Sequence, residues 1–376
     1  MPRMPRVLSS SFARSLFFVV GGSIGAGMFG LPALFSGSGL IWGSLAYWVI
    51  VAVALIIHVA YADLQAKVGS KHDLAGIAKQ SLGRFGWLVA IVTYPINVYG
   101  VLLVYLLLGS QFVAALSGAI GGPTSLFFWQ VVLWAFFAWG AHKGVKGVAK
   151  FERPITIVVV SALVLASCLA ALSGNTPSIS LFPGTFSFST FIGVVFFASL
   201  SLPVVVEVMA LDARRGAIGR RAVIIGTLIA ATLKWFFALS FAGAAQGQVI
   251  EVVGLMRALP VALSWLLPLA GFVAISGAAV SCLDSLQTTY RDEFAFPRWS
   301  AWILAILPPL VLIFVSQQSL LPLMTFLGSF VASTNALLVC LAALVMRTRL
   351  MTRPSRFMMY AAIGLCLFSI VHTFIL

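Results

Sequence analysis

The run Gly25-Ala26-Gly27-Met28-Phe29-Gly30-Leu31-Pro32 interrupts an apolar stretch that is long enough to cross a membrane. A second apolar stretch is interrupted at a matching place by Phe197-Ala198-Ser199-Leu200-Ser201-Leu202-Pro203. Hydrocarbon offers no water to an unwound backbone, so a break at this depth must line a cavity or be satisfied by protein or ligand. Paired breaks in corresponding helices therefore indicate the binding site of a transporter.

The composition around these breaks is that of a membrane protein. Of the 376 residues, 61% are hydrophobic and 9% are charged, whereas a soluble domain needs a polar surface. The apolar runs are continuous, which excludes the short alternating segments of an outer-membrane barrel. We therefore predict an all-α polytopic protein that is embedded in a lipid bilayer.

Eleven apolar segments define the predicted spans. They cover about 13–35, 39–66, 84–116, 125–141, 154–173, 188–211, 220–245, 260–288, 299–316, 320–346 and 356–376. Repeat one would cover about 13–173 and repeat two about 188–346, with 356–376 as an added helix in a single transporter domain (1–376). Because each repeat has five spans, the two repeats must have opposite orientations, which is the pattern of a five-plus-five inverted repeat with broken helices 1 and 6.

Basic residues set the predicted orientation. The net charge of +14 invites a nucleic-acid partner, but the 23 Lys and Arg residues, except Lys234 and Arg257, lie in the N-terminal tail or in alternate loops. Such loops are cytoplasmic, so we expect no nucleic acid as a partner and place Arg14, Lys146, Arg215 and Arg349 inside. The N-terminus would then be cytoplasmic and the C-terminal Leu376 outside, in what we expect to be a bacterial inner membrane.

Three motifs resemble those of a known superfamily. Gly22-Ser23-Ile24 followed by the first break is similar to the first-helix signature of the amino acid–polyamine–organocation superfamily, and most similar to its amino acid/auxin and bacterial tyrosine/tryptophan permease branches. Tyr61-Ala62-Asp63-Leu64, with Leu82-Gly83 before the third span, and Gly193 to Ser199 in the sixth also resemble these permeases. The resemblance implies the leucine-transporter-type fold and an amino acid substrate. Neither break carries the acidic or amide side chains of some relatives, which leaves the substrate identity open.

The first break offers both charges that a zwitterion needs. Backbone N–H groups near Gly27 and Met28, at the positive end of the outer half-helix, would bind a carboxylate. Carbonyl groups from Gly21 to Ile24 suit an ammonium group or a small cation. Glycine would permit close approach, since a Cβ would block it, although glycines in membrane helices also serve helix packing. The predicted substrate-binding residues of this segment are Gly22, Ser23, Ile24, Gly25, Ala26, Gly27 and Met28.

Two other spans contribute predicted substrate contacts. In the sixth span, Phe196, Phe197, Ala198, Ser199 and Ser201 would form a wall that faces the first break, where aromatic rings could close over an apolar or aromatic substrate. The alternative for each Phe is a core or lipid-facing position. In the third span, Asn97 and Tyr99 lie near mid-membrane, although Asn97 could instead bond to a neighbouring helix.

Charged side chains within the spans mark candidate coupling residues. Lys234 lies far from both ends of the seventh span, and Asp284, Glu207 and His58 lie in the inner halves of theirs. They could relay a proton or form structural pairs, and a direct pair of Lys234 with Asp284 is disfavoured by their different depths. Lys234 and Asp284 are the predicted coupling residues.

A sodium site is the alternative. In sodium-coupled relatives, helix-8 hydroxyls and helix-1 carbonyls bind the ion, which points to Ser281 with Gly21 and Ile24. However, Val280 and Cys282 supply no second hydroxyl beside Ser281, so the sequence favours H⁺ over Na⁺ as the coupling ion.

The predicted function is secondary active transport of a neutral, possibly aromatic, amino acid by alternating access. The sequence does not determine the direction of transport, the oligomeric state or the identity of the coupling ion. An intramembrane enzyme would need a convergent nucleophile or metal set, yet the four His are scattered and the four Cys show no paired spacing. We therefore predict no enzyme, no catalytic residues, no metal site beyond the possible sodium site and no cofactor. A sensor or a channel of the same fold is the remaining alternative.

Overall fold

The computed structural model describes residues 10–69, 73–143, 152–172, 180–182, 187–211, 216–244, 252–256, 258–315, 319–346 and 353–375. Four of the residues used to predict orientation (Lys146, Arg215, Arg349 and Leu376) lie outside these ranges. The orientation of the chain in its membrane therefore stays a prediction.

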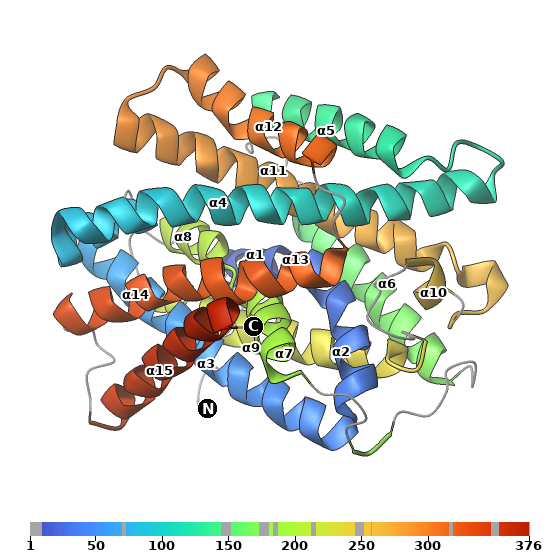
Figure 1. Ribbon diagram of the computed structural model, residues 1–376, viewed down its shortest axis with the longest axis horizontal. Helices are drawn as coiled ribbons and strands as arrows, with labels where there is room; N and C mark the ends of the chain where they lie inside the picture. The colour runs from blue at the N-terminus through green and yellow to red at the C-terminus, as the bar shows by residue number, and fades with distance from the viewer. Residues whose placement is uncertain are drawn as a thin grey trace, which may run out of the picture.

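Helices account for all the regular structure of the described residues (Figure 1). In chain order these are α1 (Ser10–Ser23), η1 (Ala26–Gly30), α2 (Leu31–Ser38), α3 (Leu40–Val68), α4 (Leu74–Ala119), α5 (Leu126–Lys143), α6 (Glu152–Leu172), α7 (Phe188–Ser199), α8 (Leu202–Leu211), α9 (Ala217–Phe241), α10 (Val252–Met256), η2 (Val261–Leu263), α11 (Leu266–Phe294), α12 (Arg298–Val315), α13 (Leu320–Phe326), η3 (Leu327–Ala332), α14 (Ser333–Met346) and α15 (Arg353–Ile375).

These helices match the predicted spans in position. Within the described residues, nine are long and apolar enough to cross a membrane, and the bent pair formed by Phe12–Ser23 and Ala26–Ser38 makes a tenth. Helix α5 occupies the place of the predicted fourth span but ends in the polar His142 and Lys143, and it is not among the nine. The protein is an integral membrane protein with an all-helical fold, as the sequence predicts.

The first span is broken where its glycines lie. Helix α1 ends at Ser23, and the chain resumes a helical course at Ala26 with a bend of 45°. Gly25 between them is extended, with φ −120° and ψ −168°. Pro32 then lies in the first turn of α2, where its missing N–H removes no helical hydrogen bond.

The sixth span is broken at the predicted place as well. Helix α7 ends at Ser199 and α8 begins at Leu202. Leu200 has φ −88° and ψ 93°, which is extended backbone open to any residue. No glycine lies within this break, so something other than backbone freedom must hold it open.

The third span begins differently from the prediction. Helical structure starts at Leu74 rather than at Arg84, because the Asp73 side chain caps the first turn by accepting from Gly76 N–H at 3.0 Å. A kink follows at Gly83, whose φ of 72° is the left-handed region that favours glycine. The transmembrane part of α4 therefore begins beyond Gly83, and a short helix precedes it.

The helices form two groups in contact. Helices α1, α3, α7–α8 and α9 pack on one another; the Tyr47 hydroxyl of α3 donates to the Ala231 carbonyl of α9 at 2.8 Å. Helices α4, α5, α11 and α12 lie together on one side of the molecule (Figure 1). Both breaks belong to the first group of helices and face α4 and α11 of the second group.

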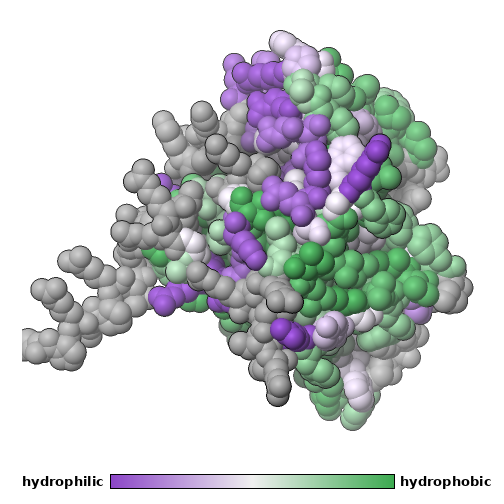
Figure 2. All heavy atoms as spheres, turned by 90° about the vertical axis from the view of Figure 1, so that its left-hand side faces the viewer, coloured by the Kyte–Doolittle hydropathy of each residue, from purple (hydrophilic) through white to green (hydrophobic). Residues whose placement is uncertain are grey.

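The surface is consistent with a bilayer environment. Large apolar side chains are exposed on many helices, for example Trp42, Phe314 and Phe374. Figure 2 shows hydrophilic side chains gathered over part of one face, beside broad apolar areas. This face lies at the end of the molecule where α4 begins and where α11 connects to α12.

Candidate functional site

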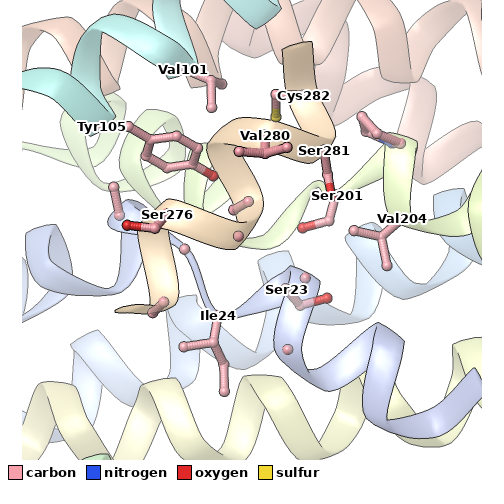
Figure 3. A pocket seen from close by; sticks show the side chains of 18 of the residues that line it. Ser23, Ile24, Val101, Tyr105, Ser201, Val204, Ser276, Val280, Ser281 and Cys282 are labelled. Atoms are coloured by element: carbon pink, nitrogen blue, oxygen red, sulfur yellow. The ribbon is translucent and has the colours of Figure 1, made fainter. Parts of the chain in front are cut away.

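A cavity of about 370 Å³ lies at the two breaks. It is bounded by α1, α4, α5, α6, the α7–α8 segment and α11. Figure 3 shows Ser276 and Ser281 of α11, Ser201 at the second break and Tyr105 of α4 around this space. The volume falls in the range of small-molecule sites.

Most of the predicted residues line this cavity. They are Gly21, Gly22, Ser23, Ile24, Gly25, Ala26 and Gly27 of the first break, Asn97 of α4, Phe197, Ala198 and Ser201 of the second break, and Ser281 of α11. The structure thus brings together residues that are as far apart as 260 positions in the sequence, although their roles remain proposals.

The cavity extends from the breaks along one half of the first and sixth spans. Phe18 and Gly22 of α1 line it on the N-terminal side of the first break, and Val204 and Glu207 of α8 line it beyond the second. On the other side of the first break, Phe29 is fully buried and contacts Phe112 and Phe237, with ring centroids 4.9 and 5.4 Å apart. The site is therefore open toward the half of the molecule that contains α1 and α8, and aromatic packing closes the other half.

Gly25 and Gly27 play different structural roles. A Cβ on Gly25 would lie 3.0 Å from the Tyr105 hydroxyl, whereas a Cβ on Gly27 would lie 2.5 Å from the Ala198 Cα. The close approach at Gly27 is therefore between the two broken spans. Gly25, by contrast, presents its bare Cα to a cavity-lining side chain.

The backbone of the first break is partly satisfied. The Met28 N–H donates to the Gly25 carbonyl at 3.3 Å, and the Ile24 N–H lies 3.1 and 3.2 Å from the Val20 and Gly21 carbonyls. Met28 is also fully buried and does not line the cavity. Contrary to the prediction, the Met28 N–H is thus not available to bind an anion, because the outer half-helix begins with a tight 3₁₀ turn.

Lys234 connects the two breaks. Its Nζ donates to the Ala198 carbonyl at 2.6 Å and to the Ser23 carbonyl at 3.2 Å, and the side chain is 2% exposed. These carbonyls end α1 and α7, where helices present partial negative charge. The ammonium group therefore lies where the carbonyl ends of two half-helices converge.

Two predicted residues of the sixth span lie behind the cavity wall. Phe196 is fully buried, one residue from the cavity-lining Phe197, because consecutive helical side chains point in directions about 100° apart. Ser199 is 5% exposed, and its hydroxyl has no hydrogen-bond partner among the described residues.

Tyr99 and Asp284 also lie away from the cavity. The Tyr99 hydroxyl bonds to Tyr290 and donates to the Leu304 carbonyl at 2.7 Å, on the opposite face of α4 from Asn97. Asp284 is half-buried on α11, nearly one turn beyond Ser281. Helical rotation therefore separates Tyr99 from Asn97, whereas Asp284 lies farther along α11 than the residues that line the cavity.

Several cavity residues were not predicted as site residues. Tyr105 and Thr156 have no distinguishing sequence context, and a Cβ on Gly21 would lie 2.3 Å from the Thr156 Oγ1. Glu207 and Ser276 also line the cavity. An acidic residue within a predicted span is unusual, and this feature of the sequence could have identified Glu207 as a cavity residue. His58 carried the same signal, and its Nε2 accepts a hydrogen bond from Ser201 N–H at 3.1 Å.

The candidate sodium residues lie on the same cavity. Gly21, Ile24 and Ser281 all line it, together with Cys282 where a second hydroxyl would be needed. In the described part of the chain, no group of three or more His, Cys, Asp or Glu side chains could hold a metal ion.

Comparison with solved structures shows the fold. The chain is similar to MhsT in complex with L-phenylalanine (TM-score 0.73, 13% identity, 96% of this chain and 97% of that chain). It is also similar to Mhp1, a nucleobase-cation-symport-1 family transporter, in a closed conformation with bromovinylhydantoin bound (TM-score 0.69, 17% identity, 90% and 78%) and in an inward-facing conformation (TM-score 0.61, 15% identity, 87% and 76%). These neighbours have the leucine-transporter (LeuT) fold, and the five-plus-five architecture predicted from the sequence is confirmed.

Comparison at the sequence level shows the family. Curated protein sequences give no match. The sequence profile of the tryptophan/tyrosine permease family, by contrast, matches residues 8–376. Family and fold identify a secondary transporter rather than an enzyme, and the chain belongs to the tryptophan/tyrosine permease family.

Proposed function

We propose that this protein is a proton-coupled secondary transporter that moves a neutral, aromatic amino acid across a bacterial inner membrane by alternating access. The observation that carries this proposal is the position of Lys234. Its ammonium group bridges the carbonyl ends of both broken spans, the place where negative partial charges would otherwise attract a coupling cation. Unlike a metal ion, a Lys amine can gain and lose a proton.

The substrate carboxylate would bind at the first break. The N–H groups of Gly25, Ala26 and Gly27 begin the outer half-helix beside the cavity, and a helix N-terminus attracts anions. The Tyr105 hydroxyl lies next to this position, as the 3.0 Å distance from a Cβ on Gly25 indicates. A carboxylate in this place would therefore meet backbone and hydroxyl donors.

The substrate ammonium would bind elsewhere than first predicted. Lys234 already uses the Ser23 carbonyl, and two cations at one carbonyl would repel. Glu207 and the hydroxyls of Ser201 and Ser281 line the same cavity and offer acceptors for it.

An aromatic side chain suits the rest of the cavity. Phe197, Val101 and Phe272 contribute apolar surface, which favours an apolar or aromatic group. MhsT was solved with L-phenylalanine, and the family is described by tryptophan and tyrosine. Both descriptions support an aromatic substrate.

Sodium coupling is the second candidate, because Gly21, Ile24 and Ser281 share the cavity. Uptake of labelled tryptophan, tyrosine, phenylalanine and leucine into proteoliposomes distinguishes proton coupling from sodium coupling. We expect accumulation of aromatic amino acids when an inward proton gradient is imposed, and none with a sodium gradient alone. Accumulation driven by a sodium gradient at equal pH would show that sodium, rather than the proton, is the coupling ion. Substrate binding without accumulation under either gradient would favour a non-transporting sensor.

A further inference from the structure

His58 links α3 and α9 to the second break. Its imidazole is 2% exposed, with Nε2 3.1 Å from the Ser201 backbone nitrogen and Nδ1 3.1 Å from the Thr227 Oγ1. Ser201 immediately precedes α8 and lines the cavity. His58, which does not line the cavity, therefore holds the extended residues between α7 and α8 through their backbone.

The hydrogen bonds assign the proton on the ring. A backbone N–H can only donate, so Nε2 must be unprotonated to accept from Ser201. The ring proton is then on Nδ1, which donates to Thr227. The conformation seen here thus contains a neutral His58 with a fixed tautomer.

Protonation of His58 is incompatible with this arrangement. An imidazolium has two N–H donors and no acceptor, so the Ser201 N–H would face another donor and lose its partner. Among the described charged residues on neighbouring elements, Lys234 on α9 binds the same break as His58. Asp63 pairs with Arg220 at 2.9 Å, and Glu207 lies six residues beyond Ser201 on α8.

Lys234 and His58 hold the same break from its two ends. Lys234 donates to the Ala198 carbonyl, and His58 accepts from the Ser201 N–H. Thr227 and Lys234 are seven residues apart on α9, which places them on one face about two turns apart. One face of α9 therefore positions both basic groups at the second break.

We propose that His58 is a positioning residue that fixes the second break in the present conformation while it is neutral, and that its protonation releases Ser201 and α8. Proton binding is thereby linked to the conformational change of the sixth span. The inference rests on the proposed transport function, to which it adds a second proton-sensitive group.

The test measures conformation without needing a substrate. Val204 on α8 lines the cavity, so Val204→Cys in a protein whose four native cysteines are replaced by Ala reports access by a membrane-impermeant thiol reagent. The labelling rate is corrected for the intrinsic pH dependence of a model thiol. We expect corrected labelling to fall at least about fivefold from about pH 8 to about pH 5, because an unmet buried N–H disfavours the labelled state.

Three variants decide the role of His58. His58→Gln keeps an acceptor for Ser201 without titrating, and it should label at the high-pH rate throughout. His58→Phe removes the acceptor and should label slowly at every pH. Thr227→Val leaves the ring without its Nδ1 partner and should displace the midpoint of the pH profile.

Two outcomes would overturn the inference. One is a His58→Gln protein with the wild-type pH profile; the other is a His58→Phe protein that labels and responds to pH like the wild type. If His58→Phe does not fold, the pH profiles of His58→Gln and Thr227→Val still test the role of His58. If these profiles behave as expected but no amino acid is transported, the proposed function fails while the conformational role of His58 stands.

Discussion

The two broken spans are interrupted by different means. In the first, Gly25 lies within the break, and Gly27 allows the backbone to approach Ala198. The second contains no glycine, and side chains from α3 and α9 occupy its open backbone groups through Lys234 and His58. Lys234 also binds the Ser23 carbonyl of the first break. The first break is thus set mainly by its glycines, whereas the second is set by tertiary contacts with groups that can carry a proton.

This difference assigns separate tasks to the two breaks. In the proposed function, the glycine-containing break offers a permanent backbone surface for the substrate. The break held by side chains can change with the protonation of its partners. Variants at the two breaks should therefore affect different properties of the protein.

The largest effect is expected from Lys234→Met. The carbonyls of Ser23 and Ala198 lose their shared donor, and no proton can be carried at this position. We expect proton-driven accumulation in proteoliposomes to be abolished, while equilibrium substrate binding is retained. Lys234→Arg is the matched variant, since Arg keeps the charge and the donors but does not release its proton. Normal accumulation by a well-folded Lys234→Met protein would reduce Lys234 to a structural residue.

Gly25→Ala should weaken substrate binding by about ten- to hundredfold, the equivalent of one charge-assisted hydrogen bond. The added methyl would lie 3.0 Å from the Tyr105 hydroxyl, and the extended backbone of Gly25 accepts alanine without strain. Calorimetry with an aromatic amino acid and with its amide measures the effect. Gly364→Ala, where an added Cβ meets no atom within 4 Å, is the control. Equal loss for the acid and the amide would show that the carboxylate does not bind here.

Gly27→Ala should lower stability by about 1–3 kcal/mol, as overpacking does. Its methyl would lie 2.5 Å from the Ala198 Cα, and backbone cannot move aside as a flexible side chain can. Thermal unfolding in detergent, compared with Gly364→Ala, checks the effect. Unchanged stability would mean that the two breaks can separate at little cost.

The smallest effect is expected from Ser281→Ala. If Lys234 supplies the coupling charge, removing this hydroxyl should leave the response of uptake to sodium unaltered in proteoliposomes at constant pH. A sodium stimulation that is present in the wild type and lost in the variant would establish the sodium site instead.

The local sequence was sufficient for the first break and for the positions of most spans. Glycines, Pro32 and apolar runs of membrane length act through backbone freedom and hydrophobicity, which belong to short segments of chain. The same is true of Gly83, where the sequence marks the approach to the third span and the structure has a left-handed kink. Most of the predicted site residues of the two breaks line one cavity because the repeat places the breaks opposite each other.

The remaining site residues depended on the register of whole helices. The rotation of α4 turns Asn97 toward the cavity and Tyr99 toward Tyr290, and a similar rotation separates Phe197 from Phe196. No pattern near Tyr105 or Thr156 indicates which groups they face. The sequence showed that Lys234 and His58 are costly residues within a membrane span. Only the tertiary structure placed both at the second break, because the carbonyl and N–H groups that they bind belong to other helices.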